Sequence, residues 1–116
     1  MIHDFSVEEL KTVAGMLMED MRGNWGWNYR ERIETTQTCL ELLVERDTGK
    51  AAQYREDLAV CHRELHSEYP DGREFRDSAN LYAYYSEEGT TDRVKAFLRD
   101  ACTYPECRSI EIPVTE

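Results

Sequence analysis

Hydrophobic residues near the start of the chain recur at helical spacing and form one continuous stripe. The stripe consists of Val7, Leu10, Val13, Ala14, Leu17, Met18 and Met21. Ser6 precedes it and Glu9 follows three residues later, which is the spacing of a capping box. Phe5 and Leu10 stand at the positions of a hydrophobic staple around that cap. Because Gly23 is a typical residue after a helix end, the pattern predicts a helix between Ser6 and Gly23.

Two further amphipathic stripes follow and predict a helical hairpin. Asn28 and Glu31 repeat the capping-box spacing before the first stripe, which ends at Thr48–Gly49. The second stripe starts almost at once and ends at the turn 69–72. The inward positions are Ile33, Thr36, Leu40, Leu43 and Val44 in the first stripe, and Ala51, Tyr54, Leu58, Cys61 and Leu65 in the second. A break this short places the two helices antiparallel and side by side.

The rest of the chain shows two shorter helical patterns. The first is weak, closes at Gly89, and contains Phe75, Ala79, Tyr82 and Tyr85. The second follows Thr91 as its N-cap, ends at Tyr104–Pro105, and contains Val94, Phe97, Leu98 and Ala101. The alternation of Ile110, Ile112 and Val114 indicates a short C-terminal extended segment. We therefore predict one all-α domain over 1–116, a compact bundle of about five helices with short turns.

The excess of acidic over basic side chains excludes some classes of binding partner. The 116 residues include 24 acidic and 14 basic side chains, so the formal net charge is -10. Direct binding to nucleic acid or to an anionic membrane is disfavoured, because both need a basic patch. No apolar stretch is long enough to cross a bilayer, and the first residues do not form a leader peptide. We expect a cytoplasmic protein with reduced cysteines whose partner is a basic protein.

Carboxylates gather on the outer sides of the predicted hairpin. Those of its first helix are Glu31, Glu34, Glu41 and Glu45, and those of its second helix are Glu56, Asp57, Glu64 and Glu68. In one interpretation they are ordinary solvated helix faces, partly paired with arginines. In the other, two adjacent rows of negative charge resemble the phosphates of a duplex and attract the basic channel of a nucleic-acid-binding protein.

Two tryptophans, Trp25 and Trp27, flank Gly26 in the loop before the hairpin. Exposed aromatic side chains on a loop are frequent anchors for a protein partner, because they bury a large area at low entropic cost. A tryptophan can also close the end of a bundle, and we favour that role for at least one of the two. Gly26 permits a tight bend, so one ring can point inward and the other outward. The loop is therefore a candidate contact site.

One group of side chains has the composition of a zinc site. His62 and His66 are four residues apart on the third predicted helix, and Cys102 and Cys107 flank a turn near the end of the chain. Together they would supply four tetrahedral ligands. In the simpler interpretation, His62 and His66 are ordinary polar residues at the margin of their helix. Cys102 then lies on the inner face of the last helix, and Cys39 and Cys61 are small core residues. We favour it, and expect no metal unless these two pairs meet.

Motifs of catalysis or phosphate binding are missing from the sequence, and we predict no enzyme activity. In size, acidity and predicted helix content the chain resembles small phage proteins that block host enzymes, including some anti-CRISPR proteins. No motif carries this resemblance, so no site residue is taken from it. The leading hypothesis is a non-enzymatic acidic protein-binding module, an inhibitor that covers a basic, nucleic-acid-binding surface of its target. The alternative is a zinc-stabilised structural or regulatory helical domain.

Overall fold

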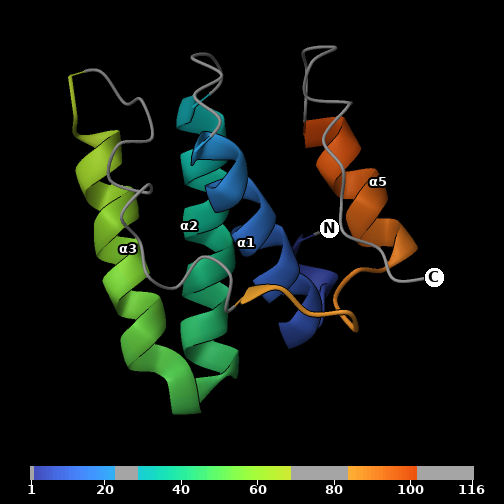
Figure 1. Cartoon of the computed structure of the whole chain (residues 1–116). Coiled ribbons are helices and arrows are strands. Elements are labelled where there is room, and N and C mark those ends of the chain that lie inside the picture. The colour runs from blue at the N-terminus through green and yellow to red at the C-terminus, as the bar shows by residue number, and fades with distance from the viewer. Residues whose placement is uncertain (1, 23–28, 69–83, 102–116) are drawn as a thin grey trace.

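The computed structural model describes residues 2–22, 29–68 and 84–101, which are mostly helical and include no strand. Four α-helices are present: α1 (Val7–Arg22), α2 (Tyr29–Arg46), α3 (Ala51–Leu65) and α5 (Asp92–Ala101). Two short 3-10 helices, η1 (Ile2–Asp4) and η2 (Thr48–Lys50), precede α1 and α3. α2 lies between α1 and α3, and α5 packs on α1 (Figure 1). The prediction of an all-α bundle is confirmed.

The start of α1 follows the sequence pattern closely. The Ser6 N–H donates to Glu9 Oε1 at 2.9 Å and the Glu9 N–H donates to Ser6 Oγ at 3.2 Å, so the capping box is formed. Every residue from 12 to 18 is buried, because α1 is covered by α2, by α5 and by the 84–90 segment. α1 is thus covered by α2, α5 and the 84–90 segment, whereas α3 packs on α2.

The predicted antiparallel hairpin is α2 followed by α3, joined only by Asp47 and η2. The Tyr54 hydroxyl on α3 donates to Asp47 Oδ2 at 2.5 Å and fixes the connection. The hydrophobic core joins this hairpin to α1 and α5. Its largest fully buried apolar side chains are Phe5, Leu10, Met18, Ile33, Leu40, Leu43, Tyr54 and Tyr84.

The chain before α5 departs from the predicted fourth helix. Residues 85–91 form an irregular stretch and a turn, so a helix does not extend through Tyr85 to Gly89. Tyr84 is nevertheless fully buried, and its ring stacks on Tyr54 with centroids 5.6 Å apart. The N-cap of α5 is as predicted, since the Val94 N–H donates to Thr91 Oγ1 at 3.3 Å.

Several predictions fall outside the described residues, namely the turn 69–72, the earlier part of the fourth helix, the 23–28 loop, the end of the last helix at Tyr104–Pro105 and the C-terminal extended segment. That one domain spans 1–116 stays a prediction. Within the described part of the chain, no helix is both long enough and apolar enough to cross a membrane.

Candidate functional site

The exposed face of α2 carries one row of carboxylates. Glu31, Glu34, Glu41 and Glu45 are all exposed, and their spacing places them on the same side of the helix. The opposite side of α2 carries its buried residues, among them Ile33, Leu40 and Leu43. Because α1 and α3 both pack against α2, the carboxylate row lies on the face that the bundle leaves open.

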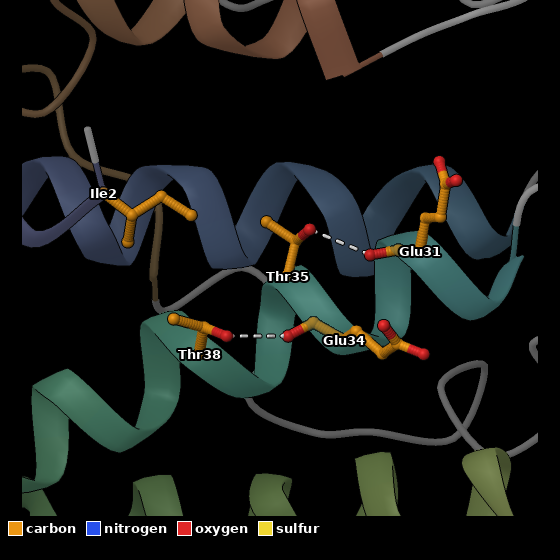
Figure 2. Close-up of a pocket in the computed structure, with 5 residues that line it drawn as sticks. All are labelled: Ile2, Glu31, Glu34, Thr35 and Thr38. Carbon is orange, nitrogen blue, oxygen red and sulfur yellow. Dashed lines mark hydrogen bonds between the residues drawn. The ribbon is translucent and has the colours of Figure 1, made fainter.

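A shallow depression of about 370 Å³ lies at the start of this row. It is lined by Ile2 of η1 and by Glu31, Glu34, Thr35 and Thr38 of α2 (Figure 2). The Thr35 hydroxyl donates to the Glu31 carbonyl at 2.8 Å, and the Thr38 hydroxyl donates to the Glu34 carbonyl at 3.1 Å. Both hydroxyl protons are therefore used within the helix, and each threonine oxygen keeps acceptor capacity. With the two carboxylates, the polar side chains of this depression present acceptors to a ligand.

Arg46 determines where the apolar side of the depression lies. Its guanidinium donates to the carbonyl oxygens of Phe5 at 3.0 Å and of His3 at 2.9 Å. These bonds hold η1 against the last turn of α2, and so place Ile2 beside the threonines. Arg30 pairs with Glu34 at 3.9 Å, but both side chains are more than half exposed, and such a pair contributes little stability. A competing cation can displace it at small cost.

The predicted row of carboxylates on α3 is not formed. The prediction of two adjacent acidic rows, one on α2 and one on α3, is therefore wrong for α3. Glu56 and Glu68 are exposed, but Asp57 is 2% exposed and Glu64 is 1% exposed. Asp57 and Glu64 lie on the same side of α3 as Tyr54 and Cys61, which faces the core. The Tyr84 hydroxyl donates to Asp57 Oδ2. Of the carboxylates that the sequence predicted for partner binding, those that form an exposed row are therefore the four on α2.

The proposed zinc ligands are only partly within the described chain. His62 and His66 are exposed and their ring centroids are 4.3 Å apart, so they share one side of α3 as predicted. Cys102 and Cys107 lie outside the described residues, as do Trp25 and Trp27. No group of three or more metal-binding side chains occurs in the portion that the structure describes.

The two described cysteines, Cys39 and Cys61, have the core role that their positions predicted. Both are fully buried and neither forms a disulfide. Burial raises the pKa of Cys39 to about 12, and burial together with the nearby Asp57 carboxylate raises the pKa of Cys61 to about 12. A thiol that is neutral and buried is a poor nucleophile. These cysteines are structural.

Glu9 forms a polar cluster that sequence reasoning recognised only in part. Besides its capping bond, Glu9 accepts hydrogen bonds from the Thr91 hydroxyl at 2.6 Å and from Arg93 Nε at 2.6 Å. The bonds from Arg93, with further help from Ser6 and Thr91, lower the pKa of Glu9 to about 2 despite its burial. The same Arg93 also donates to the Asp4 carbonyl at 3.0 Å and lies over the Phe5 ring. The cluster holds the start of α5 against α1 and leaves no carboxylate oxygen directed to a ligand.

Comparison with known proteins gives no match, whether to a family model, to a curated protein or to a solved structure. No residue role is carried over from a relative. The exposed face of α2, with the depression beside η1, is the candidate site because of its own geometry and charge.

Proposed function

We propose that the protein is a non-enzymatic binding module that attaches to a basic protein surface through the exposed face of α2. The observation that carries this proposal is the depression lined by Ile2, Glu31, Glu34, Thr35 and Thr38. Its polar groups are acceptors, and an arginine or lysine head group is a pure donor. The row continues along the helix to Glu41 and Glu45, which extends the attraction beyond a single contact.

An arginine of the partner fits the depression better than other side chains. Its planar guanidinium can donate two parallel hydrogen bonds to the carboxylate of Glu31 or to that of Glu34. Its methylene stem would then lie along Ile2. Long-range attraction from the whole row accelerates encounter, and the desolvated contact in the depression slows dissociation. Charge and shape therefore contribute at different stages of binding.

The class of target that this surface suits is a protein with a basic, nucleic-acid-binding surface. Covering such a surface would inhibit its function, as the phage proteins that block host enzymes do, some anti-CRISPR proteins among them. The single acidic row on α2 would cover one strand-binding groove, since α3 has lost two of its four predicted surface carboxylates to the core. We place the protein in the cytoplasm, where the free thiols of Cys39 and Cys61 are compatible with a reducing environment.

The test reverses the charge of the row and measures association. The triple variant Glu34→Lys/Glu41→Lys/Glu45→Lys should fail to retain the partner that the parent captures from nuclease-treated lysate of the source cells. With that partner purified, its association rate at low salt should fall at least about tenfold, and its salt dependence should flatten. Surface plasmon resonance at low and moderate salt gives both values.

A second triple variant separates the α2 face from net charge. Glu56→Lys/Glu68→Lys/Glu88→Lys changes the net charge by the same amount, and all three residues are exposed outside α2. We expect this variant to bind nearly as fast as the parent. Equal slowing in both triple variants would mean that overall charge, and not the α2 face, directs binding. Parent-like binding of the α2 variant would refute the proposal.

A further inference from the structure

Two exposed histidines lie on one side at the C-terminal end of α3, His62 in the helix and His66 directly after it. The His66 N–H donates to the His62 carbonyl at 3.1 Å, so a complete helical turn separates the two residues. Their rings are tilted by 58° and their centroids are 4.3 Å apart. Both side chains are open to solvent. The backbone therefore holds two imidazoles side by side on the surface.

This separation is close to what a shared metal ion requires. With metal–nitrogen bonds of about 2.0 Å, two imidazole centroids lie roughly 4.5 Å apart at a right-angled coordination and about 5 Å apart at the tetrahedral angle. The distance between the centroids of His62 and His66 would have to increase by less than about 1 Å, and rotation of the side chains can supply that change. No backbone movement is needed.

We propose that His62 and His66 together bind one divalent transition-metal ion, such as Ni²⁺, Cu²⁺ or Zn²⁺, through one imidazole nitrogen each. Imidazole suits these ions, whereas Mg²⁺ and Ca²⁺ prefer oxygen ligands. The site lies at the carboxyl end of α3, where the helix dipole favours positive charge. Water completes the coordination. The pair suffices without cysteine, which distinguishes this site from the four-ligand zinc centre that the sequence suggested.

Binding should also stabilise the folded chain, because the two ligands come together only when the last turn of α3 is formed. An ion that binds the folded state better than the unfolded one raises the melting temperature, and above its dissociation constant the rise grows with the logarithm of the free ion concentration. The stabilisation is a second readout that does not depend on any protein partner or on the α2 face. The tests of the metal site and of the proposed partner surface are therefore independent, and either proposal can fail without the other.

Isothermal titration with Ni²⁺, Cu²⁺ and Zn²⁺ tests the site, with Mg²⁺ as the negative control. The parent should bind one ion per chain, and His62→Ala or His66→Ala should each weaken binding at least about tenfold. His3→Ala is the matched control, since His3 is an exposed histidine far from α3 in the sequence. It should bind as the parent does. Parent-like affinity in either α3 variant, or an equal loss in His3→Ala, would overturn the proposal.

A cysteine variant tests whether the histidine pair is sufficient. Cys102→Ser/Cys107→Ser should retain Ni²⁺ binding within about threefold of the parent and should still gain thermal stability from the ion. Loss of binding in this variant would overturn the two-histidine site and favour a site that includes the thiols. Circular dichroism of every variant without metal verifies that the fold is kept, and substitutions of the exposed His3, His62 and His66 are expected to preserve it.

Discussion

Glu9 shows how one carboxylate can serve two helices. It is 3% exposed, caps the first turn of α1, and accepts hydrogen bonds from Thr91 and Arg93 at the start of α5. A buried charge is costly unless it is paired and hydrogen-bonded, and here Ser6, Thr91 and Arg93 all donate to it. The lowered pKa is the consequence, since the folded state favours the ionised form.

The linkage between this pKa and stability gives a pH prediction. The pKa of Glu9 falls from its ordinary 4.5 to about 2 in the folded protein, so its contribution is complete above about pH 5 and is lost as the pH falls toward 2. Because Arg93 is half exposed, solvent screening reduces this contribution, and we expect about 2 kcal/mol. Glu9→Gln should lower the free energy of unfolding by that amount at neutral pH.

Urea unfolding at several pH values provides the measurement. Between about pH 5 and pH 2, the difference in stability between the parent and Glu9→Gln should shrink toward zero. Glu56→Gln, which changes an exposed glutamate of α3, should follow the parent at all pH values within about 0.5 kcal/mol. A pH-independent loss in Glu9→Gln would show that the side chain acts by packing and not by its charge.

At the scale of elements, the turn at residues 86–90 is fitted closely against α1. The Thr12 hydroxyl of α1 donates to the Ser86 carbonyl at 3.2 Å, and the Gly89 N–H closes the turn on the same carbonyl at 3.1 Å. Gly89 is buried against the backbone of Glu8. A side chain at this position would overlap the Glu8 carbonyl oxygen and the Thr12 hydroxyl. The close approach of turn and helix therefore depends on glycine.

Two glycine substitutions test this contact. Gly89→Ala should lower the free energy of unfolding by at least about 2 kcal/mol, because helix backbone cannot move aside as a flexible side chain can. Gly49→Ala, in η2, is the matched control, since a Cβ there meets nothing within 4 Å. It should be neutral or slightly stabilising, by up to about 1 kcal/mol. Thermal and urea unfolding of both variants would decide, and similar losses in the two would contradict the role of this contact.

At the scale of the whole molecule, the reactivity of Cys39 and Cys61 can report how often the folded protein opens to solvent. Each is fully buried in the hairpin, and the raised pKa values keep both thiols protonated near neutrality. Alkylation requires both solvent access and a thiolate. Reaction of these cysteines must therefore await an opening that exposes them.

Alkylation kinetics turn this into a measurement. In a Cys102→Ser/Cys107→Ser background, iodoacetamide should modify Cys39 and Cys61 at least about a hundredfold more slowly than in the urea-unfolded chain, because both thiols are buried and react only after an opening. Mass spectrometry of quenched samples resolves the two sites. If opening is global, both cysteines should react together, and Gly89→Ala should accelerate both. Fast modification of either cysteine in the native protein would contradict the buried core.

Local rules account for the parts of the fold that the sequence predicted well. The capping box at Ser6 and Glu9, the N-cap Thr91 and the short break between α2 and α3 each depend on residues close together in the chain. The inward positions of α2 followed from helical periodicity for the same reason. The exposed acidic face of α2 is the complement of that stripe, so this part of the candidate site was predictable too.

Residue type misled the prediction where a charged residue faces the interior. Asp57 and Glu64 were assigned to the surface because carboxylates are usually exposed, yet they lie on the buried side of α3 with Tyr54 and Cys61. The hydroxyl that Asp57 accepts from belongs to Tyr84, which is 27 residues away. A pattern based on nearest helical neighbours contains no information about such a partner.

The sequence by itself determined α1, α2, α3 and α5, the caps at Ser6 and Thr91, the hairpin and the negative charge of α2, because these depend on contacts within a few residues. Only the tertiary structure decided which carboxylates are used inside the protein and which face a partner. It also made the depression, since Arg46 of α2 binds carbonyls more than 40 residues earlier in the chain and so holds η1, with Ile2, beside α2. The physical reason is that burial and long-range hydrogen bonds are properties of the packed molecule, and a residue's local pattern does not specify them.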